Sequence, residues 1–200
     1  LSRLACFGLL IAVFTCVHST VFAQASFFWD ADGAGGADFG GTGVWNTSNS
    51  NWRKSTGGFN YERKSWQNAA NPRNRAIFDQ TSGTVTLASD VKASVVSFIN
   101  QGGYVLTTST GKTLTLEHGN EISTTAGTST IQNIDLVGIS GLQKTGSGTL
   151  NLSYSGTMSL QNSIRVSNGR LNLLSGTTLD PNASVLVGFD KGGSGVPYLD

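Results

Sequence analysis

The sequence predicts an all-β fold of stacked parallel coils, and three observations point to it. Two short segments, 149–152 and 170–173, carry leucines at alternate positions, which places both leucines of each segment on one face of a strand. The two segments lie 21 residues apart, and Gly, Ser and Asn turns without helical periodicity separate them. Gly accounts for 26 of the 200 residues, and helix formers are scarce after residue 80, which favours short strands joined by tight corners.

Further short strands are predicted from Gly83 onward, at 84–87, 95–98, 104–106, 114–116 and 184–187. With roughly 20 residues in each coil, this region would hold about five or six coils. In such a stack, each strand pairs with the strands above and below it, and inward Leu, Ile and Val side chains form a continuous core. The pair Asn168-Gly169 could instead form a two-residue hairpin turn, so an antiparallel β-sandwich remains the alternative architecture.

Residues 1–25 are predicted to form a signal peptide that is cleaved after Ala25. Arg3 precedes an apolar run over 4–22, and Ala23-Gln24-Ala25 supplies the small residues of a cleavage site. The alternative is a retained membrane anchor, because the run is long enough to span a bilayer. We expect export by the Sec machinery, a secreted or cell-surface location, and no stable membrane insertion of the mature chain.

Cleavage would leave a chain without cysteines and without net charge. Cys6 and Cys16 are the only cysteines, and both leave with the signal peptide, so burial and backbone pairing must hold the mature fold. Removal of Arg3 leaves 12 basic residues against 12 acidic ones. A protein that binds nucleic acid usually carries a strong basic excess, so we expect no nucleic-acid partner.

Residues 26–82 form a distinct segment that is rich in aromatic residues and predicted loops. It contains all four tryptophans, and Gly is frequent between residues 33 and 43. Large rings in a loop-rich segment are typical of a compact cap, and a stack of coils needs a cap over its first apolar face. The sequence therefore predicts an aromatic N-terminal cap over 26–82 and a repeat region over 83–200.

The stretch 138–173 resembles the autotransporter-associated β-strand repeat, also called the passenger-associated transport repeat. The family pattern is a G-L-x-K-x-G-x-G-T-L-x-L core followed by a V-x-x-G-x-L-x-L close, over about 33 residues. The matching residues are Gly141, Leu142, Lys144, Gly146, Gly148, Leu150, Leu152, Val166, Gly169, Leu171 and Leu173. The resemblance implies a right-handed parallel β-helix that is exported as a passenger domain and is displayed at, or released from, a bacterial cell surface.

Three groups of polar residues invite a reading as binding sites, and each has a plainer structural reading. Asp30-Ala31-Asp32-Gly33 begins like a calcium loop, but no Glu closes it, so a turn is favoured. Glu117-His118-x-x-Glu121 has metal-ligand spacing for a helix, whereas its surroundings predict strand and turn. A cluster of six basic residues favours a solvated, partly paired surface over contact with a polyanion or glycan. Its members are Arg53, Lys54, Arg63, Lys64, Arg73 and Arg75.

No catalytic constellation emerges from the sequence, so we expect no catalytic residues, no cofactor and no bound metal. From Gly83 onward no two acidic residues are adjacent or two apart. A Ser/His/Asp triad would have to use His118, and no serine lies in a nucleophile elbow. Stacking could still align distant carboxylates, which keeps a polysaccharide lyase or hydrolase as an alternative function.

The favoured function is a non-enzymatic structural or passenger module of a bacterial surface or secreted protein. The first alternative is a carbohydrate-binding adhesin in which Trp45, Trp52 and Trp66 contact a surface glycan. An exposed last coil would also leave a strand edge without a partner, so end-to-end self-association is expected.

Overall fold

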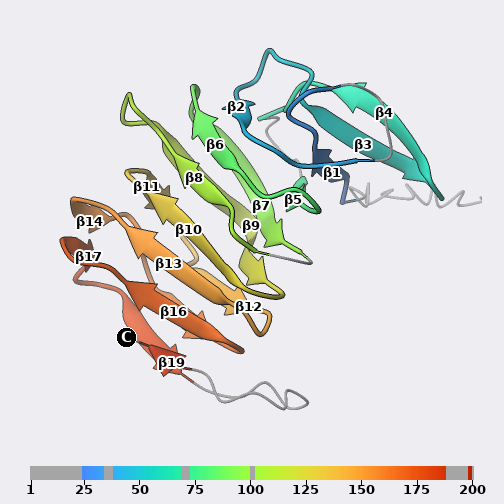
Figure 1. Ribbon diagram of the computed structural model, residues 1–200. Helices are drawn as coiled ribbons and strands as arrows, with labels where there is room; N and C mark the ends of the chain where they lie inside the picture. The colour runs from blue at the N-terminus through green and yellow to red at the C-terminus, as the bar shows by residue number, and fades with distance from the viewer. Residues whose placement is uncertain (1–23, 34–37, 69–72, 100–101, 188–197, 200) are drawn as a thin grey trace, which may run out of the picture.

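The protein is an all-β solenoid in the computed structural model, which describes residues 24–33, 38–68, 73–99, 102–187 and 198–199 (Figure 1). The signal peptide expected over residues 1–25 lies outside this part of the chain except for its last two residues. The described strands form one large sheet, a second sheet beside it and a small third sheet. The predicted all-β solenoid is therefore confirmed.

The strands of each sheet come from positions spread along the whole chain. The ten-stranded sheet contains β1 (Ser26–Trp29), β3 (Trp52–Gly57), β4 (Asn60–Lys64), β5 (Arg75–Phe78), β7 (Val91–Phe98), β9 (Thr113–Thr124), β11 (Asp135–Val137), β12 (Leu142–Thr145), β15 (Ser163–Val166) and β18 (Ser184–Val187). The seven-stranded sheet contains β2 (Gly43–Trp45), β6 (Thr84–Leu87), β8 (Val105–Thr107), β10 (Thr128–Gln132), β13 (Thr149–Ser153), β16 (Arg170–Leu173) and β19 (Tyr198–Leu199). The two-stranded sheet pairs β14 (Gly156–Met158) with β17 (Thr177–Leu179).

Each coil passes from one sheet to the next and then begins again one layer further along the stack. β12, β13 and β14 form one coil, and β15, β16 and β17 form the next, with each strand paired in parallel to its counterpart. Paired residues are 21 or 22 positions apart, as Thr149 is from Arg170 and Leu142 from Ile164. The solenoid has about 5 turns, which agrees with the predicted number of coils.

Antiparallel pairing among the named strands is restricted to β1, β3 and β4, so the β-sandwich alternative is wrong. The alternative reading of Asn168-Gly169 as a hairpin turn is also wrong, because β15 and β16 on either side of it belong to different sheets. Gly169 instead turns the chain at a corner with φ of 71°. An ideal Cβ there would lie 2.3 Å from the Gly148 carbonyl oxygen of the preceding coil.

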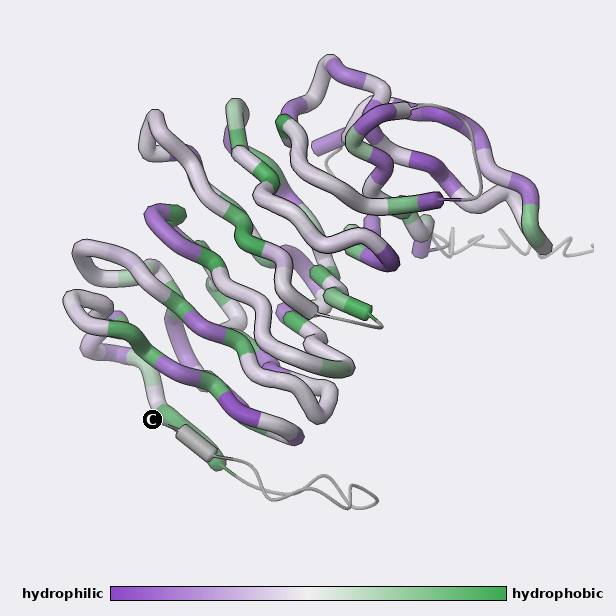
Figure 2. The backbone as a smooth tube through the Cα atoms, viewed as in Figure 1, coloured by the Kyte–Doolittle hydropathy of each residue, from purple (hydrophilic) through white to green (hydrophobic). Residues whose placement is uncertain are grey.

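The core is a set of apolar columns that run along the stack. Val96, Ile122 and Val166 occupy equivalent positions on β7, β9 and β15, and each has no exposed surface. The predicted inward leucines at 150, 152 and 171 are likewise buried. Figure 2 shows apolar positions alternating with polar ones along the strands of the seven-stranded sheet. Period-two patterning thus fills the inside of the coils and leaves Thr, Ser and Asn facing water.

The segment 26–82 combines strands of the stack with a hairpin of its own. β1 and β5 pair in parallel in the ten-stranded sheet, and β2 pairs in parallel with β6. The β3–β4 hairpin is antiparallel, and β3 pairs with β1 (Figure 1). The described part of the chain contains no helix that could cross a membrane.

Candidate functional site

The four tryptophans form the centre of the aromatic N-terminal segment. Their rings lie 4.8–5.1 Å apart in the pairs Trp29–Trp52, Trp45–Trp52, Trp45–Trp66 and Trp52–Trp66. None is more than 1% exposed. Edge-to-face and tilted contacts at this spacing favour packing, and they cover the ring faces that a sugar would need. The rings of Trp45, Trp52 and Trp66 are therefore not exposed for the predicted contact with a glycan. These residues form part of the core instead.

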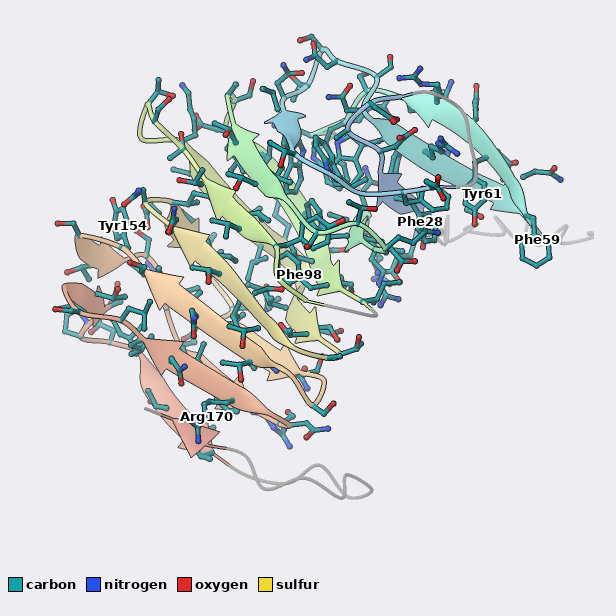
Figure 3. The ribbon with its side chains drawn as sticks, viewed as in Figure 1. Phe28, Phe59, Tyr61, Phe98, Tyr154 and Arg170 are labelled. Atoms are coloured by element: carbon teal, nitrogen blue, oxygen red, sulfur yellow. The ribbon has the colours of Figure 1, made fainter. Side chains whose placement is uncertain are left out.

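A second group of aromatic residues faces outward from the same segment, and sequence reasoning missed it. Phe28, Phe39 and Tyr61 are half-buried, and their ring centroids lie 5.1–5.4 Å from one another. Phe59, at the turn between β3 and β4, is 96% exposed (Figure 3). We call these four residues the outer aromatic face. Alternation along β1 could have revealed it, because Phe27 and Trp29 point inward and Phe28 therefore points outward.

A buried ion pair supports the outer aromatic face from below. The Arg53 Nε atom donates to Asp30 Oδ2 at 2.6 Å, and both side chains are almost fully buried. The Arg53 guanidinium also lies over the Phe39 ring, 4.9 Å from its centroid. Asp30 is thus committed to Arg53 rather than free for calcium. The expectation of a solvated basic surface is wrong at Arg53, whereas Lys64 pairs with Glu62 in solvent.

The glycines of the repeat motif lie at corners where the backbone of one coil approaches the next. Gly141 has φ of 91°, and an ideal Cβ there would lie 1.9 Å from the Ser163 carbonyl oxygen. At Gly146 the corresponding distance is 2.3 Å to Thr124 O, and at Gly148 it is 2.8 Å to Gly127 O. Each contact is with backbone, so a side chain could be accommodated only by separating the coils.

Lys144 is the unusual member of the repeat motif, because its side chain points into the core. It has no exposed surface and occupies the same column as Ile122 and Val166. Its Nζ atom donates to the carbonyl oxygens of Thr145 at 2.6 Å, Gly146 at 2.8 Å and Asn168 at 3.1 Å. Burial lowers the pKa of Lys144 to about 8. The ammonium group therefore joins the corner of its own coil to the corner of the next.

The apolar residues of the motif have the packing role that their alternation predicts. Leu142, Leu150, Leu152, Val166 and Leu171 are buried, and Leu173 is half-buried against the same core. Leu150 pairs in register with Leu171, and Leu152 with Leu173.

The residues Glu117, His118 and Glu121 do not converge on one point. Glu117 pairs with Lys92 at 2.9 Å, whereas the Glu121 carboxylate accepts a hydrogen bond of 2.6 Å from Thr145 Oγ1. Within the described ranges, no three His, Cys, Asp or Glu side chains lie close enough together to hold a metal ion.

Several carboxylates of the coils accept hydrogen bonds from backbone amides. These are residues that the enzyme alternative would need for catalysis. Asp90 accepts a hydrogen bond from the Thr113 amide at 3.0 Å, and Asp135 accepts one from the Ser159 amide at 3.1 Å. Asp180 accepts one from the Asn182 amide at 2.8 Å. These three acids stabilise corners and turns of the solenoid.

The amino-acid sequence of the chain is similar to that of a known bacterial protein. The chain is 35% identical over 181 residues to a protein named adhesin BmaC autotransporter, from Brucella suis biovar 1 (strain 1330). The alignment covers 90% of this chain but only 5% of that much longer protein. No protein-family model matches the chain, and no solved structure matches it either. Fold and similarity together fit an autotransporter-related repeat protein, and the particular repeat family stays a prediction.

Proposed function

We propose that the chain is a non-enzymatic passenger-type module of an exported, adhesin-like bacterial protein. The observation that carries the proposal is the stacking of 21- to 22-residue coils whose motif residues are used for packing and corners. The similarity to an autotransporter adhesin supports a location at the cell surface or in the medium. A rigid solenoid is suited to this role, because each coil contacts only its neighbours and holds attached segments at a set distance.

The test is export of the full chain with a C-terminal epitope tag from a bacterial host. Sequencing the N-terminus of the exported product would give Ser26 if the signal peptide is cleaved after Ala25. A control with Ile11→Arg and Val13→Arg places two charges in the predicted apolar run and should retain the chain in the cytoplasm. Retention of the unaltered chain would overturn the proposal.

The second candidate function is glycan contact through the outer aromatic face. Half-buried Phe28, Phe39 and Tyr61 offer ring edges and faces on a rigid sheet, and exposed Phe59 extends from the adjacent hairpin turn. Aromatic rings of this kind bind the apolar faces of sugars. Glycan-array binding should be lost in a Phe59→Ala, Tyr61→Ala variant. It should be kept in Ile139→Ala, which removes a 68%-exposed apolar side chain elsewhere. Equal binding by all three proteins would refute this candidate.

We also propose end-to-end self-association through β18. This strand is at one end of the order of its sheet, and Val185, Leu186 and Val187 are 37%, 54% and 47% exposed. A second copy could extend the sheet there by strand pairing. Sedimentation at increasing concentration should show association that Leu186→Lys abolishes and Ile139→Lys does not. A strictly monomeric unaltered chain would overturn this proposal.

A further inference from the structure

Two adjoining hollows lie beside Gly119, within β9 of the ten-stranded sheet. One, of about 340 Å³, is lined by residues that include Arg73, His118 and Glu121, and also by Gln24, which the expected cleavage after Ala25 would remove. The other, of about 150 Å³, is lined by residues that include Gln143 and Arg165. Gly119 lines both, so the hollows form one shallow depression. We call it the corner groove and define it by these residues together with Ser163.

A change of backbone direction inside β9 creates the middle of this groove. His118 and Asn120 have φ values of 61° and 49°, which are uncommon for residues with side chains. Between them, an ideal Cβ on Gly119 would lie 2.4 Å from the Ser94 carbonyl oxygen of the coil before. Two left-handed residues beside a glycine in close backbone contact hold this corner in an uncommon shape. Backbone of this kind is often found where a protein positions groups for binding.

The groove runs parallel to the axis of the solenoid. Val95, Glu121, Gln143 and Arg165 are in register on four neighbouring strands, β7, β9, β12 and β15. Strands in a sheet lie about 4.8 Å apart, so the row covers roughly 14 Å. Arg75 on β5, the next strand of the sheet, is in register with Val95, and Arg73 lies two residues before it in the chain and lines the same hollow as Val95. An occupant would be an extended chain that crosses successive coils.

The charges along the groove indicate what kind of chain fits. Exposed Arg73 and Arg165 lie toward its two ends, whereas Glu121 lies between them. Ser163 and Gln143 add a hydroxyl and an amide group. A polynucleotide carries a negative charge on every phosphate, and it would place one against Glu121. A glycan with separated acidic groups can instead place its anions on the arginines and its neutral hydroxyls on Glu121 and Gln143.

We propose that the corner groove binds an extended acidic glycan that carries carboxylate or sulfate groups at intervals. This inference rests on the proposed function, because an exported module meets such glycans outside the cell. It assigns the ligand class to a surface that is separate from the outer aromatic face.

The test is calorimetric titration of the exported chain with chondroitin sulfate oligosaccharides and, separately, with neutral dextran oligosaccharides and a single-stranded oligothymidylate. The groove variant is Arg73→Gln with Arg165→Gln. The control variant is Lys112→Gln with Arg170→Gln, which removes the same charge from other surfaces. Figure 3 labels Arg170 on β16 of the seven-stranded sheet, whereas Glu121, Gln143 and Arg165 of the groove belong to strands of the ten-stranded sheet. We expect the groove variant to bind the acidic glycan at least about tenfold more weakly, and the control variant to bind it like the unaltered chain.

Three results would overturn the inference. Equal weakening in both variants would mean that only overall charge matters. Oligothymidylate binding as tight as chondroitin sulfate binding would point to a general polyanion surface. No glycan binding at millimolar concentration by a chain that is exported as expected would remove the ligand while leaving the proposed passenger function intact.

Discussion

The aromatic segment over 26–82 and the coils that follow keep water out of their interiors in different ways. In the first segment, four tryptophans and Phe78 fill an irregular space between β1, β2, β3 and β5. In the coils, aliphatic side chains of similar size repeat in columns, and Leu150 pairs with Leu171 directly beneath it. The first arrangement depends on the shapes of particular rings, whereas the second depends on a repeated spacing.

The comparison shows where each region is vulnerable. In a repeated column, many equivalent residues contribute to the stability of the core. The corners of the coils, however, leave no room for a side chain where neighbouring coils approach closely. The aromatic segment contains few equivalent positions, so the loss of one ring leaves a large space. We therefore expect core truncation to damage the aromatic segment most, and backbone crowding to damage the coils most.

The largest expected effect is that of Trp52→Ala. Trp52 is buried and contacts Trp29, Trp45, Trp66 and Phe78 at ring distances of 4.8–5.5 Å. Removing the indole should lower the free energy of unfolding by about 4 kcal/mol. Leu150→Ala, the matched change in the coils, should cost about 3 kcal/mol. Urea denaturation followed by circular dichroism measures both. A larger loss for Leu150→Ala would reverse the ranking of the two regions.

The next largest effect is expected from a side chain added at a corner glycine. Two glycines of the coils distinguish the cost of the left-handed backbone conformation from the cost of crowding the next coil. Gly141 and Gly176 have φ of 91° and 87°, but only at Gly141 does a Cβ meet backbone, 1.9 Å from Ser163 O. Gly176→Ala should cost about 1 kcal/mol for the left-handed conformation alone. Gly141→Ala should cost about 3 kcal/mol, since the coils must also move apart. Equal losses in urea denaturation would show that close coil contact is unimportant.

The buried ammonium of Lys144 makes the stability of the coils depend on pH. Its pKa is about 8 in the folded chain, below the usual value of 10.5. Between these values the unfolded chain binds more protons, so the free energy of unfolding rises with pH by at most about 1.4 kcal/mol per unit. Below pH 8 both states are protonated, and the cost of burying the charge is fully present. Lys144→Met should remove this rise in denaturation curves between pH 8 and 10. An unchanged slope would mean that Lys144 keeps its proton or is hydrated.

The coils could be predicted from the sequence because stacking imposes a spacing on the chain itself. Leucines at alternate positions, repeated after 21 residues, are a direct consequence of strands that pair one coil further on. The same alternation predicts the orientation of Lys144, which lies two residues after the buried Leu142 and therefore points inward. Its three carbonyl partners could not be predicted, because Asn168 belongs to the next coil.

The candidate surfaces were harder to predict, for two different physical reasons. Tryptophan was the expected sugar-binding residue, but a segment without disulfides needs its largest rings for its core, which leaves Phe28 and Tyr61 outside. The corner groove has Arg73 and Arg165 toward its two ends, and these residues, which are far apart in the sequence, line one surface only because the coils stack. Local patterns contain no information on which polar residues of separate coils share a column.

The smallest expected effect concerns Tyr104, where the two regions meet. Its ring is 5.3 Å from Phe78, and its hydroxyl oxygen lies 2.7 Å from Asp79 O and 2.6 Å from Thr81 O. One proton serves both carbonyls, so Tyr104→Phe should cost about 1 kcal/mol at pH 7. The hydroxyl of Tyr104 also makes stability depend on pH. Burial, and then the charge of Asp79, raise the pKa of Tyr104 above its usual 10.0. The folded chain therefore holds this proton more tightly than the unfolded chain does, and the stability that the hydroxyl contributes is lost as the pH rises above 10. This dependence is opposite in sign to that of Lys144. Denaturation between pH 9 and 11 should show a steeper loss for the unaltered chain than for Tyr104→Phe, and parallel curves would mean that the hydroxyl is as accessible to water as in the unfolded chain.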